Sequence, residues 1–375
     1  MPSELSVGRL FDGDTWHSNV RVAWHLGRIT AVTPCDAGES PLPGVLAPGF
    51  VDIQVNGGGG VLFNTAREPD DLARMVSAHA RLGTTSLLPT LITDSLEAMT
   101  RGIELAIEAR RRGIPGIAGV HFEGPHISTV KRGAHPERHI RPLADRELDL
   151  YSREEVGVRL LTVAPEVVPP TRIRELVDSG VVVFLGHSNA DTDTVSAALE
   201  AGASGFTHLF NAMSPLTARD PGMVGTALSH PDSWCGLILD GHHLHPLTAR
   251  LALDCAGRRR MVLVSDAMPP VGTQQQEFTL LGDRVRRDSD RLVNEEGRLA
   301  GSVLDLGAAV RYATDRLGVE PEQALRMASL QPARAVGLDG DQGRIRPGGP
   351  ADLVLLDDSL RVCRTWMAGQ EVGHD

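Results

Sequence analysis

Short apolar runs rich in branched residues alternate with helical patterns along most of the chain from residue 50 onward. We expect eight strands, at residues 50–55, 84–88, 116–122, 158–163, 181–186, 205–207, 235–239 and 261–264. These runs are almost continuously apolar, which is typical of parallel strands covered on both faces. Eight successive strand-then-helix units favour a closed barrel over an open sheet. The expected fold class is therefore α/β, with a (β/α)8 TIM barrel.

The connecting segments carry helix start and stop signals. Asp94 is a good N-cap, Glu97 occupies the third helical position, and Gly113 ends the pattern. A second helix is expected at residues 191–201 and ends at Gly202. These boundaries support the alternation of strands and helices.

The two ends of the chain have a different character. A typical barrel of this kind takes about 250 residues, and this chain has 375. Residues 1–48 and 343–375 consist of short alternating stretches with glycine turns, which indicates strands. We expect them to form one small β-sandwich domain built from both termini, with the barrel at residues 49–342.

Composition narrows the classes of partner. Acidic side chains number 48 and basic ones 37, and this net charge of −11 is unfavourable for nucleic acid or an anionic membrane. The four cysteines, with no CxxC pair, predict neither a disulfide framework nor a thiolate zinc site. The sequence has no signal-peptide pattern and no apolar run near 18 residues, so we expect a cytoplasmic protein. A small anionic substrate would need a local cationic site.

Metal-binding side chains follow several expected strands. Glu123 follows the third strand, His187 the fifth, His208 the sixth and Asp266 the eighth. The active site of such a barrel lies at these strand ends. One carboxylate and two imidazoles are typical of Zn²⁺ with an open position for water, and Asp266 is placed to handle the proton of that water. A single histidine here is more often a hydrogen-bonded rim residue, and Asp266 alone could be a helix cap. Only the joint pattern favours a metal site.

Five motifs carry a resemblance to a known family. They are PGFVD at 48–52, HFEGP at 121–125, GHS at 186–188, THLFNAM at 207–213 and VSDA at 264–267. Together they resemble the N-acetylglucosamine-6-phosphate deacetylases of the amidohydrolase superfamily, over nearly the whole chain and in the same order. The Glu-Gly-Pro and His-Leu-Phe-Asn-Ala-Met segments are specific to this group, whereas a single Gly-His pair is not.

The resemblance implies roles for individual residues at the reacting centre. Glu123, His187 and His208 would bind the metal, and Asp266 would be the catalytic carboxylate. His135 resembles the family histidine that contacts the acetyl carbonyl, and Ala134 beside it would also touch substrate.

The resemblance also implies a phosphate site. Asn211, the backbone of Ala212, Arg219 and His243 resemble the phosphate contacts, and Arg219 would serve the neighbouring subunit of a homodimer. Plainer interpretations stay open, because Arg219 could be an exposed loop residue and His243 part of a polar turn. Phosphate does require cationic or N–H donors somewhere in the site.

The first expected strand decides the metal count. Many amidohydrolases have His-x-His there for a second metal, but this chain has Gln54 and Asn56, whose neutral amides are poor Zn²⁺ ligands. The resemblance implies one metal, with Gln54 touching its bound water and the substrate. The end of the fourth strand, residues 163–166, also lacks the lysine of two-metal members, and Lys131 lies in a different loop.

The expected activity is metal-dependent hydrolysis of the N-acetyl group of N-acetylglucosamine 6-phosphate, giving glucosamine 6-phosphate and acetate. One divalent ion is expected per subunit, with zinc the favoured ion. Two alternatives stay open: a related substrate such as N-acetylgalactosamine 6-phosphate, and a catalytically inactive sugar-phosphate-binding homologue.

Overall fold

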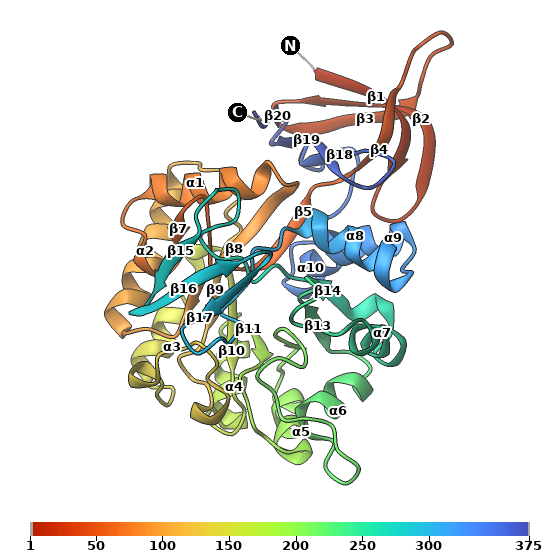
Figure 1. Cartoon of the computed structure of the whole chain (residues 1–375). Coiled ribbons are helices and arrows are strands. Elements are labelled where there is room, and N and C mark those ends of the chain that lie inside the picture. Colours follow the sequence, from red (N-terminus) through yellow and green to blue (C-terminus); the bar gives the residue numbers. More distant parts are fainter. Residues whose placement is uncertain (1–2, 374–375) are drawn as a thin grey trace.

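Eight parallel strands form a closed ring at the centre of the chain, as the alternation predicts. The computed structural model describes residues 3–373 (Figure 1). The strands follow one another around the ring in chain order. They are β5 (Phe50–Val55), β8 (Thr84–Ile92), β9 (Gly119–Glu123), β10 (Val158–Val163), β11 (Val182–Leu185), β12 (Gly205–Phe206), β13 (Trp234–Leu237) and β14 (Met261–Leu263). A parallel bridge between Val55 and Ala267 joins the first strand to the chain leaving the last one.

Helices surround this ring (Figure 1). They are α1 (Pro69–Ala80), α2 (Leu96–Arg111), α3 (Asp145–Tyr151), α4 (Pro170–Asp178), α5 (Thr192–Glu200), α6 (Gly222–Ser229), α7 (Pro246–Cys255), α8 (Leu306–Leu317), α9 (Pro321–Ala328) and α10 (Leu330–Ala335). Within residues 3–373, none of the helices has the length and apolarity to cross a membrane.

One predicted helix cap is wrong by one residue. The N-cap of α2 is Ser95, whose hydroxyl accepts a hydrogen bond from the Ala98 amide at 3.2 Å. The carboxylate of Asp94 instead accepts hydrogen bonds from the Ser95 amide and from Asn64. The local sequence favoured Asp94 as the cap, but its side chain is instead bound by Asn64, a residue distant in the chain. The helix expected at residues 191–201 is α5, and its N-cap is Asp191.

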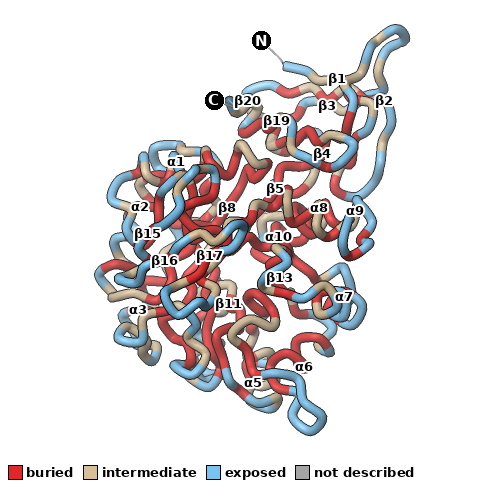
Figure 2. The backbone as a smooth tube through the Cα atoms, viewed as in Figure 1, coloured by how far each residue is buried: buried red, intermediate tan, exposed pale blue. Residues whose placement is uncertain are grey.

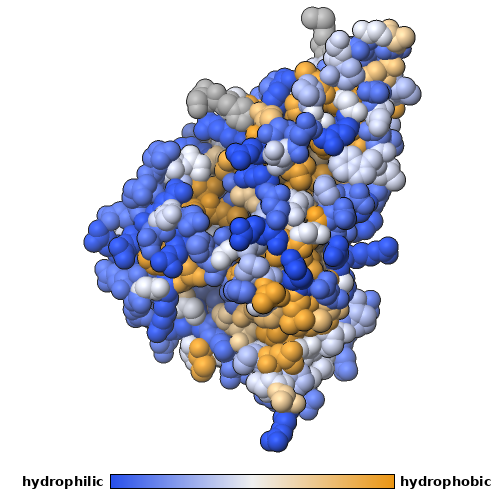
Figure 3. All heavy atoms as spheres, turned by 45° about the vertical axis from the view of Figure 1, so that its right-hand side comes forward, coloured by the Kyte–Doolittle hydropathy of each residue, from blue (hydrophilic) through white to orange (hydrophobic). Residues whose placement is uncertain are grey.

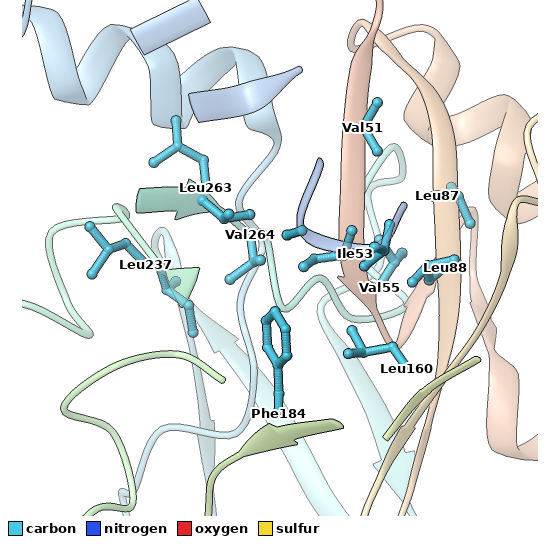
Figure 4. Packing of buried hydrophobic residues seen from close by; sticks show 14 of the residues in the cluster. Val51, Ile53, Val55, Leu87, Leu88, Leu160, Phe184, Leu237, Leu263 and Val264 are labelled. Carbon is cyan, nitrogen blue, oxygen red and sulfur yellow. The ribbon is translucent and has the colours of Figure 1, made fainter. Parts of the chain in front are cut away.

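An apolar layer fills the barrel below its carboxyl rim. Buried positions run through the centre of the molecule (Figure 2). Figure 4 shows Phe184 and Leu160 pointing toward Val264 and Ile53, and these four residues line one small internal cavity of 10 Å³. Because this layer is closely packed, a ligand can reach the polar strand ends only from the carboxyl side.

The two termini form a separate small domain. Its strands are β1 (Ser3–Phe11), β2 (Trp16–His25), β3 (Arg28–Pro34), β4 (Leu42–Pro48), β18 (Leu353–Leu356), β19 (Val362–Met367) and β20 (Gln370–Glu371). They pair in the order β20-β19-β18-β4-β1-β2-β3. The rings of Trp24 on β2 and Trp366 on β19 lie 6.4 Å apart although three strands separate them in that order. The sheet therefore curls over its own apolar core, which gives the expected sandwich of two layers.

The domain limits predicted at 48/49 and 342/343 stay a prediction. Only Gly49 separates β4 from β5, so the chain passes directly from one domain to the other. Residues 343–345 were expected in a strand but have no strand structure, although the Ile345 amide donates to the Asp12 carbonyl at 2.9 Å.

An antiparallel insert between β14 and α8 was not predicted. It consists of β15 (Glu277–Leu280), β16 (Asp283–Asp288) and β17 (Arg291–Asn294), and it crosses the front of the barrel in Figure 1. Two further short strands, β6 (Gly57–Gly58) and β7 (Val61–Leu62), pair beside the rim. The insert has its own small apolar cluster, which contains Phe278, Leu280, Val285 and Leu292.

Candidate active site

The barrel rim encloses a cavity of 200 Å³ that collects most of the predicted site residues. Those lining it are Glu123, Ala134, His135, His187, His208, Asn211, Ala212, His243 and Asp266. Gln54 lies beside them, because its amide nitrogen donates to the carboxylate of Glu123 at 3.1 Å. Arg219 lies instead on an exposed stretch before α6, outside the lining of this cavity. Its role stays a prediction.

Three ligand atoms meet at one point in the cavity. Oε1 of Glu123 lies 2.9 Å from Nε2 of His208 and 3.2 Å from Nε2 of His187, and the two nitrogens are 3.0 Å apart. Ligand atoms around a tetrahedral Zn²⁺, with bonds near 2.0 to 2.1 Å, are about 3.3 to 3.4 Å from one another. The observed triangle is close to that spacing. His135 lies at its edge, with Nε2 4.0 Å from Oε2 of Glu123.

The hydrogen bonding of His187 makes it suitable as a ligand. Its Nδ1 lies 2.8 Å from the carbonyl oxygen of Lys131, which can only accept, so Nδ1 carries the proton. Nε2 then faces the Glu123 carboxylate, and a proton or a metal ion must lie between these two atoms at 3.2 Å. Anchoring of the second ring nitrogen by a backbone carbonyl is usual for metal-bound histidine. The donor set therefore fits a divalent ion.

The charge state of the pocket supports the same conclusion. Burial alone would raise the pKa of Glu123, but hydrogen bonds from His187 and His208 hold it well below its ordinary value. Burial would lower the pKa of His208, but its hydrogen bond to Glu123 and the charge of that carboxylate raise it. Glu123 is therefore a buried carboxylate ion that favours a positive charge beside it.

Asp266 lies across the cavity with a different charge balance. Burial, reinforced by the negative charge of Glu123, raises the pKa of Asp266 to about 6. Its Oδ1 accepts hydrogen bonds from the amide of Asn56 at 2.6 Å and the amide of Gln54 at 3.2 Å. A carboxyl group with a pKa near neutrality can both accept and return a proton at physiological pH.

His135 is placed to donate a hydrogen bond. The backbone amide of Thr93 donates to Nδ1 of His135 at 3.3 Å, so Nδ1 is the unprotonated nitrogen. Burial lowers the pKa of His135 to about 3 and keeps the ring neutral. Nε2 therefore carries the hydrogen and faces the cavity beside Glu123. This arrangement suits contact with a carbonyl oxygen better than metal ligation.

Several of these residues have strained backbones. The φ angles of His187, His208, Ala212 and Asp266 are 48°, 32°, 52° and 51°. These values lie in the left-handed region, which residues other than glycine rarely adopt. Such strain persists only where surrounding contacts hold it, and it is concentrated at functional sites. The strained turns direct side chains from the strand ends into the cavity.

Three of the residues expected to contact phosphate follow β12 and β13. Asn211 and Ala212 line the cavity together with His243. Nδ1 of His243 lies 2.6 Å from a carboxylate oxygen of Asp240, which orients the ring. Arg219, on the loop that projects before α6 (Figure 1), is exposed to solvent.

Some lining residues were missed at the sequence level. Asn56 was noted only as a poor ligand, yet it makes the 2.6 Å hydrogen bond to Asp266. Ile92, Met268 and Leu280 form an apolar part of the wall. An apolar side chain at a strand end carries no chemical signature in the sequence, so only the spatial arrangement identifies it.

Comparisons with known proteins agree with this arrangement. Residues 45–372 match the amidohydrolase family. The chain is 49% identical to N-acetylgalactosamine-6-phosphate deacetylase of Shewanella sp. (strain ANA-3), over 87% of this chain and 83% of that protein. It is 39% identical to N-acetylglucosamine-6-phosphate deacetylase of Bos taurus, over 88% and 83% respectively. The crystal structure of the N-acetylglucosamine-6-phosphate deacetylase from Pasteurella multocida superimposes with a TM-score of 0.94, at 30% identity and 99% coverage of both chains.

The ligand triangle predicts one tightly held divalent ion per chain. Elemental analysis of purified protein should give a stoichiometry near one, and Glu123→Ala should lose the ion because the variant removes the only charged ligand of the three. Glu97→Ala, at an exposed position on α2, is the matched control and should keep it. A stoichiometry near two in the wild type would contradict the single site.

Proposed function

The chain belongs to the amidohydrolase family, and on that premise we propose that it hydrolyses the N-acetyl group of N-acetylglucosamine 6-phosphate. The products are acetate and glucosamine 6-phosphate. The observation that carries the proposal is the pairing, in one cavity, of a metal-type triangle with a separate carboxyl group whose pKa is about 6. The names of the relatives supply the substrate class.

In the proposed mechanism, three side chains would hold the metal. Glu123, His187 and His208 would hold one divalent ion, and zinc is the expected ion because of the imidazole and carboxylate donors. When bound, the ion acts as a Lewis acid and lowers the pKa of a bound water toward about 7. Gln54 donates to both Glu123 and Asp266, so it keeps these two carboxyl groups in a fixed relation.

Proton transfer is assigned to Asp266. As the carboxylate, Asp266 accepts a proton from the attacking water. It then donates that proton to the sugar nitrogen as the C–N bond breaks, which converts a poor leaving group into an amine. Asn56 holds the Oδ1 atom of Asp266, so Oδ2 is the oxygen left for the proton.

His135 stabilises the charge that develops on the acetyl oxygen. Its Nε2–H is aimed into the cavity by the contact between Nδ1 and Thr93. A donor placed at such an oxyanion contributes about 3 kcal/mol to the stability of the transition state. Because the ring stays neutral, this donation does not compete with proton transfer at Asp266.

Phosphate recognition is assigned to Asn211, the Ala212 amide, His243 and Arg219. We propose that Arg219 acts in the site of a second copy, as part of a cytoplasmic homodimer. Its loop is exposed, and the exposed fractions of Leu216, Leu247 and Leu251 are 53%, 68% and 48%. The face that carries α6 and α7 shows hydrophobic atoms gathered in its lower half (Figure 3). Exposed apolar side chains near this loop suit contact with another subunit.

The epimeric substrate N-acetylgalactosamine 6-phosphate is a second candidate. It is favoured by the 49% identity to the deacetylase of that name from Shewanella. An inactive binding homologue is disfavoured, because Glu123, His187, His208 and Asp266 are all present and meet in one cavity.

A small substrate panel tests the proposed function. Metal-loaded wild type should release acetate from N-acetylglucosamine 6-phosphate and act poorly on the sugar without phosphate, because a protein of net charge −11 needs a local site to bind a dianion. Steady-state kinetics on both epimers, with and without phosphate, measure this. A higher kcat/KM for the galactosamine epimer would transfer the assignment to that substrate, and indifference to phosphate would remove the phosphate from recognition.

The role of Asp266 predicts a specific kinetic defect. Asp266→Asn should bind metal normally while kcat falls by a factor of about 10² or more, because general acid–base catalysis is lost. Asp254→Asn, at an exposed position on α7, serves as the control. Activity of Asp266→Asn within a few-fold of wild type would make Asp266 a structural residue.

Loss of the Arg219 guanidinium should affect only phosphorylated substrates. A hydrogen bond to a charged group contributes about 1.5 to 3 kcal/mol, so Arg219→Ala should lower kcat/KM for them by roughly 10- to 150-fold. Arg101→Ala, exposed on α2, should leave it unchanged. Equal losses with and without phosphate would show that Arg219 supports the fold or the dimer instead.

Mixed dimers test whether Arg219 acts across subunits. Combining Arg219→Ala chains with Asp266→Asn chains should restore activity, since one of the two sites in each mixed dimer then has both groups. If Arg219 acts within its own chain, mixing should restore nothing.

A further inference from the structure

The cavity has an apolar wall that the proposed mechanism leaves without a role. Ile92 at the end of β8, Met268 after β14 and Leu280 at the end of β15 line the cavity, and their exposed fractions are only 3%, 3% and 2%. All three belong to the apolar cluster of the insert, together with Val285 and Leu292. The wall is therefore the inner edge of a packed core.

The order of strands places the Ile92 side of this wall opposite Asn211 and Ala212. In the ring β5-β8-β9-β10-β11-β12-β13-β14, four steps separate β8 from β12 in either direction. Ile92 ends β8, whereas Asn211 and Ala212 follow β12. In a hexosamine 6-phosphate, the nitrogen on C2 and the phosphate on C6 also lie at opposite ends of the sugar ring. A substrate with its phosphate near β12 therefore extends its acyl group toward β8.

We propose that Ile92, Met268 and Leu280 form an acyl wall that limits the substrate to an acetyl group. This inference rests on the proposed function and adds its acyl specificity. With the acetyl oxygen near His135 and the C–N bond near Asp266, the methyl group faces the wall. Each additional methylene would have to enter the core of the insert, and well-packed cores resist such overpacking.

Contacts with neighbouring loops hold the insert on both sides, so the wall cannot easily move away from a larger acyl group. Arg138, on the loop that carries His135, donates to the carbonyl of Leu281 at 3.1 Å. On the other side, Nε2 of His242 lies 2.9 Å from a carboxylate oxygen of Asp290. The Met268 amide donates to the Ser302 carbonyl at 3.0 Å. These contacts tie the wall to both loops that carry substrate-binding residues.

The test compares acyl chains on one sugar phosphate. N-acetyl, N-propionyl and N-butyryl glucosamine 6-phosphate are offered to metal-loaded wild type, and release of the free amine is measured. One methylene in an apolar pocket changes discrimination by roughly 10- to 200-fold. We expect wild type to prefer acetyl over propionyl within that range. Leu280→Ala should raise the propionyl-to-acetyl ratio of kcat/KM by about tenfold or more, because it opens space of the required size.

Leu292→Ala is the matched control. Leu292 is a buried leucine of the same cluster that lies away from the cavity. Its loss therefore weakens the insert without enlarging the cavity beside the wall. The ratio of two substrates on one preparation does not depend on the fraction of folded enzyme, so it stays informative if a variant is unstable. Ile92→Ala provides a second opening of the wall from the barrel side and should also raise the ratio.

The outcomes separate the acyl wall from the proposed function. Equal kcat/KM for acetyl and propionyl in wild type, an unchanged ratio in both Leu280→Ala and Ile92→Ala, or an equal rise in Leu292→Ala would overturn the acyl wall alone. Failure of metal-loaded wild type to release amine from any of these amino-sugar phosphates would overturn the proposed function and the wall with it.

Discussion

Closure of the parallel barrel between its first strand and the end of its last strand is the constraint on which the site depends. The amide of Asp266 donates to the carbonyl of Gln54 at 3.0 Å, and Val55 bridges Ala267 just beyond. This seam brings Asn56 and Gln54 against the side chain of Asp266. Without closure, the amides of β5 and this carboxyl group would lie at opposite edges of an open sheet.

The seam also explains how two buried carboxyl groups coexist in one cavity. Glu123 is kept ionised by His187 and His208, whereas the pKa of Asp266 rises to about 6 through burial and the charge of Glu123. Gln54 donates to both and holds them in one arrangement. Different surroundings thus suit two chemically similar groups to the separate tasks that we propose for them, metal binding and proton transfer.

The parts outside the barrel have unequal relations to the site. The curled terminal sheet is held by its own core, in which Trp24 and Trp366 meet, and lies beyond the amino end of β5. The insert instead shares Ile92 and Met268 with the wall of the cavity. A change in the insert therefore acts directly on the space available to substrate.

The sequence by itself determined the eight-strand alternation, the helix ended by Gly202 and the identity of the chemical groups at the rim, because periodicity and side-chain chemistry are local properties. It predicted that Glu123, His187, His208 and Asp266 lie at strand ends, and the structure brings them to one cavity. The tertiary structure alone decided that Ser95 caps α2, that Asn56 donates a hydrogen bond to Asp266 and that Leu280 lines the cavity. Each of these depends on contacts between segments distant in the chain, and such contacts are set by barrel closure and core packing.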